Sequence, residues 1–386
     1  MTKRRVLGVT GIRSDYDIMS SVFRAIADHP ALELSVVVTG AHLSPSYGST
    51  IDAIREDGFA IAEQIHSLIN GDDDVARVKG LAIQLQGLVQ TTARVRPDIL
   101  LVLGDREEAM TTALAGAYMN IAVAHVAGGD RVVGNVDDQV RHAVTKLAHL
   151  HFVTNQDSYD RIIRLGEQPF RVHNTGNPGL DRLITTPALS DAELSRRLAF
   201  EIAEGEPLVV VIQHVISSEI HDAYRQMKTT LESVAELGLK TILIYPNSDP
   251  GGYGLTTAIR EYESRPFLKT VKNLPRLEFV NVMRRASCLV GNSSAGLLEA
   301  PVLKLPVINV GNRQQGRLHA ENVVFVPHDV TAITTAVRTA VFDTAYRAAV
   351  QRCSNPYGDG RASERIAGIL ASVELGGTLL IKDITY

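Results

Sequence analysis

Tryptophan is absent from this chain of 386 residues, and cysteine occurs only twice, at Cys288 and Cys353. Two cysteines so far apart provide neither a disulfide framework nor a thiolate zinc site, so we expect a reduced, cytoplasmic location. The sequence also lacks an apolar run long enough to span a bilayer. Its N-terminal apolar segment is interrupted by Arg13 and Asp15, which makes that segment too short for a signal peptide.

Basic residues are neither in excess nor clustered. The chain has 39 lysines and arginines against 43 aspartates and glutamates, which gives a net charge of −4. Without a basic patch, the protein is not expected to bind nucleic acid. An anionic ligand must therefore be held by a few arginines placed close to it.

Apolar residues make up 45% of the sequence and are punctuated regularly by glycine and proline. This composition is typical of a globular protein, and 386 residues favour two domains over one core. Short β-branched runs alternate with longer helical patterns, which predicts parallel sheets covered by helices on both faces. The predicted fold class is therefore α/β, with two doubly wound, Rossmann-type domains. A polar segment without a strand follows NTGNPGL, so we place the domain boundary after residue 180.

Strands are predicted in both halves of the chain. Those of the first half cover residues 6–10, 34–39, 98–103, 121–126, 151–154 and 171–174, with helices at 18–28, 75–94, 107–119 and 137–148. Those of the second half cover residues 208–213, 241–245, 277–280, 287–290, 307–310 and 323–326. Ligands of such folds bind at the carboxyl ends of the strands, so polar residues at these ends are candidates for a functional site, and we expect a cleft between the two domains.

The segment from residue 291 to residue 317, GNSSAGLLEAPVLKLPVINVGNRQQGR, is typical of a site for a nucleotide diphosphate. Ser293 and Ser294 stand where a helix is expected to begin, and the unpaired N–H groups and dipole of a helix N-terminus favour an anion. Glu299 follows in that helix, where its carboxylate would accept hydrogen bonds from a ribose. Arg313 comes after the next predicted strand. In the alternative interpretation a serine simply caps the helix and Glu299 is solvated.

Three more polar residues follow predicted strands. Arg13 comes after the first strand, and its guanidinium suits bidentate contact with phosphate. Gly8 and Gly11 beside it lack the third glycine of a dinucleotide-binding fingerprint, so nicotinamide chemistry is not expected. His214 and Asn247 follow strands of the second half, and His214 has either a structural role or a place in the site.

Carboxylates are concentrated in the first half of the chain. Asp105 and Asp130 each follow a glycine after a predicted strand, and Asp137 and Asp138 open a predicted helix. Acids held near one another, or sheltered from water, have shifted pKa values and act as proton donors or bases near neutral pH. Asp137 either has such a role or caps its helix, since Arg141 lies four residues further on.

No metal site is expected. His149 and His151 are the only suggestive pair, and alternate residues of a strand share a face without any ligand.

Nearly the whole chain is covered by a series of motifs, which read TGIRSDYD, TGAHLSPSYG, LGDREEA, AHVAGGD, GNVDDQVRHAVTKLAHLHF, NTGNPGLD, IYPNSD, VGNSSAGLLEAP and VINVGNRQQGR. Together they resemble the UDP-N-acetylglucosamine 2-epimerase superfamily, and specifically its hydrolysing branch, which serves sialic-acid-type sugar synthesis. The resemblance implies a GT-B-like fold with domains at residues 1–180 and 181–360, and a C-terminal segment, 361–386, that returns to the first domain. It also implies a nucleotide-sugar substrate, no cofactor, and a homodimer or homotetramer.

The resemblance also implies roles for individual residues. Nucleotide contacts would come from Arg13, Asn247, Ser293, Ser294, Glu299 and Arg313. Catalytic roles would fall to Asp105, Asp137 and His214, with Arg106 and His142 supporting the sugar site.

Two positions depart from the family pattern. The glutamate that usually precedes the two glycines is Ala127 here, and the proline that often follows the histidine is Val215. Because Ala127 removes one acid or base, either Asp130 takes part of its work or the substrate differs.

The implied reaction inverts the sugar at C2. Departure of UDP from C1 acidifies the C2 hydrogen and permits elimination to a 2-acetamidoglucal. One carboxylate, from Asp105, Asp130 or Asp137, would take the C2 proton, and the sequence leaves open which one. Rival interpretations are a non-hydrolysing epimerase, a GT-B glycosyltransferase and an inactive sugar-nucleotide binding protein.

Overall fold

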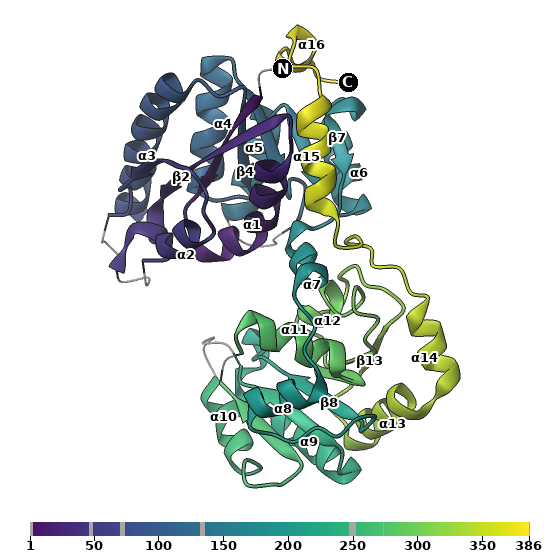
Figure 1. Cartoon of the computed structure of the whole chain (residues 1–386). Coiled ribbons are helices and arrows are strands. Elements are labelled where there is room, and N and C mark those ends of the chain that lie inside the picture. The colour runs from purple at the N-terminus through teal and green to yellow at the C-terminus, as the bar shows by residue number, and fades with distance from the viewer. Residues whose placement is uncertain are drawn as a thin grey trace. The chain divides into compact units, whose positions relative to one another are not determined.

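The structure is a computed structural model that describes residues 3–45, 49–69, 74–131, 136–246, 252–272 and 274–385. The chain divides into two compact units (Figure 1). Unit 1 comprises Met1–Arg182 and Tyr357–Tyr386, and unit 2 comprises Leu183–Pro356. None of the described helices is both long enough and apolar enough to cross a membrane.

Unit 1 is built around a parallel sheet of seven strands in the order β3-β2-β1-β4-β5-β6-β7. These strands are β1 (Arg4–Thr10), β2 (Leu32–Thr39), β3 (Ile61–Ile65), β4 (Ile99–Leu103), β5 (Ala122–Val126), β6 (Leu150–Val153) and β7 (Val172–Asn174). Every residue of β4, β5 and β6 is buried. Such continuous apolar runs form strands that are covered on both faces, which is the architecture that the sequence predicted.

The helices of unit 1 are α1 (Arg13–Asp28), α2 (Ile51–Glu56), α3 (Asp74–Val95), α4 (Glu107–Met119), α5 (Val136–Leu147), α6 (Gln156–Arg164), α15 (Ala362–Ser372) and α16 (Gly377–Leu380), with short 3₁₀ turns at Gly40–Leu43, Pro169–Arg171 and Pro178–Leu180. Helix α1 packs Phe23 against β1 so closely that a Cβ at Gly8 would lie 2.5 Å from the phenylalanine ring. Helix α15 adds Ile366 and Leu370 to the same hydrophobic core. The C-terminal helix is thus an integral part of unit 1.

Beyond α15, the buried Arg171 and the half-buried Lys382 hold the end of the chain on unit 1. Arg171 donates to the carbonyl oxygens of Thr378, at 2.9 Å, and Ile381, at 2.7 Å. Lys382 Nζ donates to carbonyl oxygens at the end of α5 and lies 2.8 Å from the carboxylate of Glu167. Burial raises the pKa of Glu167, but hydrogen bonds from His151 and from Lys146 and Lys382 outweigh it and hold that pKa at about 2. The C-terminal segment is therefore fixed by charge as well as by packing.

Unit 2 has a parallel sheet of six strands in the order β10-β9-β8-β11-β12-β13. Its strands are β8 (Leu208–Ile212), β9 (Lys240–Ile244), β10 (Leu268–Val271), β11 (Cys288–Gly291), β12 (Val307–Val310) and β13 (Val323–Val326). Its helices are α8 (Asp191–Leu198), α9 (Ala223–Leu237), α10 (Gly252–Arg260), α11 (Arg276–Arg285), α12 (Ala295–Leu298), α13 (Val330–Phe342) and α14 (Thr344–Gln351), with a 3₁₀ turn at Ser217–Asp222. Helix α7 (Asp181–Thr185) leads from unit 1 into unit 2.

One predicted strand is wrong. Residues 277–280 belong to helix α11, whose buried residues Val280 and Met283 are spaced as on a helix face. A short apolar run does not distinguish a strand from a helix by itself. Pro275 at the N-cap and two arginines in the last turn were the available helix signals. Strands β3 and β10, at the edges of the two sheets, were not predicted.

Candidate functional site

In unit 1, the buried side chain of Arg141 joins Asp105 to Asp130. Asp105 follows strand β4, Asp130 follows strand β5, and Arg141 projects from α5. One guanidinium nitrogen forms an ion pair with Asp105 Oδ2, and the other lies 3.9 Å from Asp130 Oδ2. The exposed fraction of the Arg141 side chain is 8%, and those of the two aspartates are 16% and 30%. The structure thus brings together two acids that the sequence placed at separate strand ends.

Asp130 is also held by two hydroxyl groups. Thr154 Oγ1 donates to Asp130 Oδ1 at 2.6 Å, and Ser158 Oγ donates to the same oxygen at 2.7 Å. Thr154 follows strand β6 and Ser158 lies on α6, so together with Arg141 on α5 they fix this carboxylate from three consecutive elements of the chain.

The turn that carries Asp105 is tied to strand β5. His125 Nε2 lies 2.7 Å from the carbonyl oxygen of Gly104. Burial lowers the pKa of His125 to about 3, so the imidazole is neutral and Nε2 donates this hydrogen bond. The carbonyl of Ala127 accepts a hydrogen bond of 2.9 Å from Arg141, and the φ of Ala127 is +59°. At the position where the family usually has a glutamate, the backbone carbonyl therefore accepts a hydrogen bond that holds Arg141.

Helix α5 contributes the remaining predicted residues of this region. Asp137 lies in its first turn, one turn before Arg141, and His142 directly follows Arg141. The Nδ1 atom of His142 is buried and has no hydrogen-bond partner among the described residues. Both residues are thus on the helix that anchors the aspartate pair.

A second set of carboxylates lies around Arg106, the N-cap residue of α4. Its guanidinium lies 3.7 Å from the carboxylates of both Glu107 and Glu108. Burial raises the pKa of Glu108 to about 7, and burial likewise raises that of Asp15, at the start of α1, to about 6. Strands β1 and β4 are neighbours, which is why residues 90 positions apart come together here. Glu108 and Asp15 were not among the predicted site residues.

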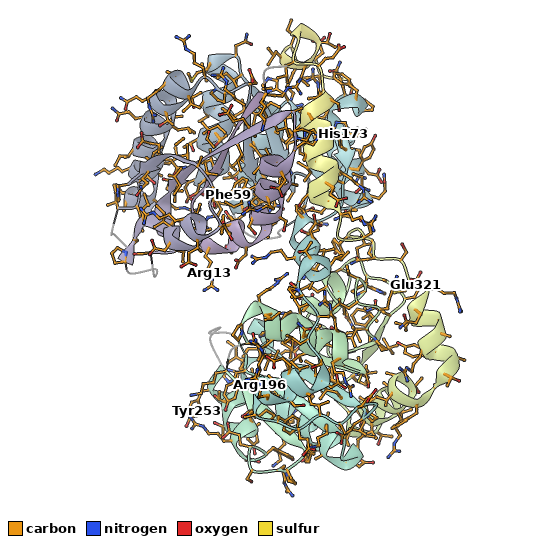
Figure 2. The ribbon with its side chains drawn as sticks, in the orientation of Figure 1. Arg13, Phe59, His173, Arg196, Tyr253 and Glu321 are labelled. Atoms are coloured by element: carbon orange, nitrogen blue, oxygen red, sulfur yellow. The ribbon has the colours of Figure 1, made fainter. Side chains whose placement is uncertain are left out.

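Arg13 opens helix α1 and is largely solvated. Its side chain is 75% exposed and lies 3.8 Å from Asp17 (Figure 2). A guanidinium this exposed is available to an external anion, and its ion pair with Asp17 orients it only weakly.

In unit 2, the side chain of Asn292 forms hydrogen bonds with both backbone groups of His214. Its Oδ1 accepts from the backbone N–H of His214 at 2.7 Å, and its Nδ2 donates to the His214 carbonyl at 2.9 Å. Asn292 follows β11 and His214 comes two residues after β8, and these strands are paired. A φ of +130° at Gly291 allows this approach, since a Cβ there would lie 2.1 Å from the Ile212 carbonyl oxygen.

Arg313, which follows strand β12, contacts the backbone of Asn292. Its Nη1 donates to the carbonyl of Asn292 at 3.1 Å, and Gln314 Nε2 donates to that carbonyl at 2.9 Å. His214, Arg313 and the segment after β11 therefore lie together at the carboxyl ends of β8, β11 and β12. Asn247, which was also predicted to contribute, lies outside the described residues.

The two serines precede a helix that is shorter than expected. Helix α12 has only four residues, and Ser294 occupies its N-cap position without a side-chain capping hydrogen bond. The hydroxyl of Ser293 accepts from Ala295 N at 3.3 Å. Glu299 follows the helix rather than lying within it. Burial raises the pKa of Glu299, and the nearby Arg276 opposes that shift.

Sequence reasoning missed Arg141 and Asn292, as it missed Asp15 and Glu108. Arg141 was noted only as a partner for Asp137 within its own helix. Burial of a polar side chain was the missing information, because Arg141 is 7% exposed and Asn292 is fully buried. Among the described residues, no group of three or more His, Cys, Asp or Glu side chains is arranged to hold a metal ion.

Comparison with known proteins places this architecture in a family. The sequence profile of the family described as UDP-N-acetylglucosamine 2-epimerase matches residues 24–371. The UDP-N,N'-diacetylbacillosamine 2-epimerase (hydrolyzing) of Legionella pneumophila is 33% identical over 383 residues, which cover 99% of this chain and 100% of that protein. The UDP-N-acetylglucosamine 2-epimerase of Neisseria meningitidis serogroup B is 29% identical over 339 residues, 87% of each chain.

Solved structures agree. The crystal structure of UDP-GlcNAc 2-epimerase from Neisseria meningitidis bound to UDP-GlcNAc superposes with a TM-score of 0.80 at 18% identity, covering 95% of this chain and 99% of that one. The predicted GT-B-like fold class of two parallel α/β sheets is thereby confirmed. The chain belongs to the UDP-N-acetylglucosamine 2-epimerase family.

Proposed function

We propose that this protein is a hydrolysing 2-epimerase. It converts UDP-N-acetylglucosamine, or a closely related nucleotide 2-acetamido sugar, into UDP and the free 2-epimer, a sugar of the N-acetylmannosamine type. The proposal is supported by Asp105 and Asp130, which Arg141 contacts at the carboxyl ends of the strands of unit 1. Relatives named as hydrolysing epimerases, of which one is 33% identical over nearly the whole chain, support the same branch.

The chemistry requires a base, because the C2 hydrogen of the sugar is not acidic. Departure of UDP from C1 gives the ring oxocarbenium character and makes the C2 proton removable. A carboxylate takes that proton, and the C–H electron pair forms the C1–C2 double bond of a 2-acetamidoglucal. Water then adds its hydroxyl group to C1, while C2 is protonated on the opposite face. The net reaction consumes one water, releases UDP and inverts C2.

We assign the base to the pair Asp105 and Asp130. Both carboxylates lie at the strand ends where ligands of doubly wound sheets bind. The guanidinium of Arg141 lies against both carboxylates, whose side chains are 16% and 30% exposed, and a well-placed base contributes about 10² to 10⁴ in rate. Asp137 and His142, on the same helix as Arg141, are the neighbouring candidates for delivering the second proton.

Unit 2 is assigned to the nucleotide. Ser293, Ser294 and Arg313 surround the Asn292 backbone at the end of β11, and they suit the diphosphate. Stabilising the charge that develops on the departing UDP is the catalytic contribution of these groups. Glu299 is assigned to the ribose hydroxyls, because a carboxylate accepts two hydrogen bonds from a vicinal diol.

The test is incubation in D₂O with two substrates offered separately, UDP-N-acetylglucosamine and the UDP-2,4-diacetamido-2,4,6-trideoxy sugar. We expect one of them to give UDP and the free 2-epimer with deuterium at C2. Free sugar without deuterium would exclude the proton transfer at C2. Labelled sugar that is still attached to UDP would identify a non-hydrolysing epimerase instead. No turnover of either substrate, with UDP bound, would indicate an inactive sugar-nucleotide binding protein.

Two matched variants test the assignment of the base. Asp105→Asn removes the carboxylate at the carboxyl end of β4, and Asp98→Asn changes the acid just before its amino end, where Asp98 Oδ2 accepts from Arg5 N at 2.7 Å. Asp105→Asn should abolish turnover and leave UDP affinity, measured by calorimetry, within about threefold of the wild type. Asp98→Asn should keep both. Near-normal turnover by Asp105→Asn would remove Asp105 from the mechanism.

A further inference from the structure

The carboxyl ends of strands β1 and β4 mark the point at which the strand order of the first sheet reverses. The chain runs from β1 through β2 to β3 on one side, and β4 then lies on the other side of β1. Ligands of doubly wound sheets bind at such a switch point. The charged residues that follow the two strands are Arg13 and Asp15, at the start of α1, and Asp105 and Arg106, before α4. These residues are therefore placed to meet a ligand.

Two glycines at this place make room for the side chain of Glu108, in the first turn of α4. A Cβ at Gly11, after β1, would lie 1.6 Å from Glu108 Oε1, and one at Gly40, after β2, would lie 3.1 Å from the same oxygen. Any larger residue at Gly11 would therefore displace this carboxyl group. Each glycine follows the threonine that ends its strand, so the same Thr-Gly pair occurs at both strand ends.

Glu108 is buried, but one of its carboxyl oxygens lacks a hydrogen-bond partner. The side chain is 7% exposed, and Oε2 accepts no hydrogen bond from any described residue. The Nε atom of Arg106 is also buried and donates to none of the residues in the described part of the chain. These two atoms lie 3.7 Å apart, which is too long for a hydrogen bond. A small rotation of the Arg106 side chain would join them.

The guanidinium of Arg106 also faces solvent. Its side chain is 42% exposed, and its Nη2 lies 3.7 Å from Glu107 Oε2, again beyond hydrogen-bond distance. A guanidinium suits bidentate contact with a phosphate or a similar anion. Arg106 can therefore turn inward to Glu108 or outward to a ligand, and the charge of Glu108 affects which position is favoured.

Glu107 and Glu108 differ in charge near neutral pH. Burial raises the pKa of Glu108 to about 7. Burial acts on Glu107 in the same direction, but a hydrogen bond from Arg77, on α3, and the charges of both arginines outweigh it, so the pKa of Glu107 is lowered. Glu107 is thus ionised throughout the neutral range, whereas Glu108 gains and loses its charge within it.

The other ionisable groups at this place lie on α1 and after β2. Burial raises the pKa of Asp15 to about 6, and the charge of Arg106 opposes that shift. Burial lowers the pKa of His42, in the 3₁₀ turn after β2, to about 4, so its imidazole is neutral. The Nε2 atom of His42 lies 3.0 Å from Thr10 Oγ1 of β1. Of these groups, Glu108 is the one whose charge changes at about pH 7.

We propose that Glu108 is a positioning residue for Arg106. Its ionised carboxylate draws the guanidinium inward, and its protonated carboxyl group leaves Arg106 to contact the nucleotide sugar. This role rests on the proposed function, because the anion that Arg106 meets is taken to be that substrate. Binding removes the arginine from Glu108 and makes the carboxyl group harder to ionise, so binding takes up a proton. By the same linkage, the affinity falls as the pH rises above about 7.

Calorimetry with UDP-glucose measures this coupling as binding rather than as turnover. UDP-glucose carries a nucleoside diphosphate whose phosphates are ionised at every pH used, so the ligand itself takes up no proton. The full-length protein should bind it about fivefold more weakly at about pH 8.5 than at about pH 7, because loss of one charged partner shifts the pKa of a carboxyl group by about one unit. Titrations in two buffers of different ionisation enthalpy should show proton uptake on binding.

Two variants of neighbouring residues provide the matched comparison. Glu108→Gln is neutral at every pH, so its affinity should change by at most about twofold over the same range, with the remaining slope due to Asp15. Glu107→Gln removes a charge that is present throughout the range, so it should tighten binding equally at each pH and keep the wild-type slope. Arg106→Gln should weaken binding and abolish most of the proton uptake.

The outcomes separate this role from the reaction itself. An affinity of Glu108→Gln that falls with pH in parallel with the wild type would overturn the role of Glu108. Binding to the wild type without proton uptake would do so as well, and that measurement needs no variant that folds. Proton-linked binding by a protein that releases no labelled sugar in D₂O would refute the reaction and leave Glu108 as the residue that positions Arg106. Turnover without the linkage would refute this role and leave the reaction.

Discussion

Replacing Arg141 by methionine should destabilise unit 1 far more than loss of an ordinary ion pair. The guanidinium is 8% exposed and contacts Asp105, which is 16% exposed, Asp130 at 3.9 Å and the Ala127 carbonyl at 2.9 Å. Methionine retains most of the apolar stem, so the change mainly removes the charge and its hydrogen bonds. Removing one partner of a buried ion pair costs about 3–5 kcal/mol, because the other charge remains in a poorly solvated place.

A double-mutant cycle separates the ion pair from the other losses. Asp105→Asn alone should cost about 1–3 kcal/mol, since Arg141 then retains Asp130 and the carbonyl. The double variant should be more stable than the sum of the two single losses predicts, by about 1–3 kcal/mol, because the two residues are in contact. The control is Arg77→Met, which removes an ion pair to Glu107 from an arginine that is 51% exposed, and it should cost at most about 1 kcal/mol.

Hydrogen exchange measured by mass spectrometry is the suitable assay, because two units need not unfold together and a single unfolding midpoint would mix them. Peptides from strands β4 and β5 report the opening free energy of unit 1. Additive single losses, or an Arg141→Met loss no larger than that of Arg77→Met, would refute a coupled buried pair.

Three further predictions concern stability. Glu108 has a pKa raised by burial from 4.5 to about 7, so its contribution to stability is complete below pH 4.5 and is lost, by at most about 3 kcal/mol, as the pH rises through 7. Glu108→Gln should flatten this pH dependence of the opening free energy that exchange in β4 and β5 reports, whereas Glu56→Gln on the exposed face of α2 should keep it. Gly291→Ala should destabilise unit 2 by at least about 2 kcal/mol in the same exchange assay, because the φ of Gly291 is +130° and the new Cβ would lie 2.1 Å from a carbonyl oxygen. Gly368→Ala is the control, since a Cβ there meets open space on α15, and it should stabilise unit 1 by about 0.5–1 kcal/mol. Lys382→Met should speed hydrogen exchange in residues 373–385 without changing exchange in unit 2, because it removes the ion pair that fixes the end of the chain; unchanged exchange there would mean that packing alone holds this segment.

The sequence predicted the central strands and one edge strand of each sheet, β7 and β13, but missed the other edge strands, β3 and β10. Strands such as β4 and β8 are buried on both faces and therefore read as continuous apolar runs. Strand β3, with the sequence IAEQI, lies at an edge where only one of its five residues is buried, and its pattern is too mixed to stand out. The predicted strand at 277–280 failed because the sequence LEFV, with three apolar residues among four, is too short to distinguish the two periods.

For the site, the rule that ligands bind at the carboxyl ends of strands found the acids but not what holds them. Asp105 and Asp130 follow neighbouring strands, and that relation could be deduced from the chain order. The contact with Arg141 depends on how α5 crosses the sheet, and the sequence suggested only pairing within the helix, between Asp137 and Arg141. Sequence periodicity reports which face of a helix is buried, not which charge lies opposite it.

The replacement at Ala127 acquires a physical meaning in this setting. Its carbonyl, not a side chain, meets Arg141, and the acid of this turn is Asp130, three residues later. Asp130 Oδ1 accepts from two hydroxyl groups, and a carboxylate that accepts such hydrogen bonds is stabilised in its ionised form. An acid held in this way suits the removal of a proton better than its delivery. If Asp130 does take over work that the family gives to a glutamate, that work is on the base side of the reaction, and the proton that returns to C2 must come from another group, for which α5 presents Asp137 and His142.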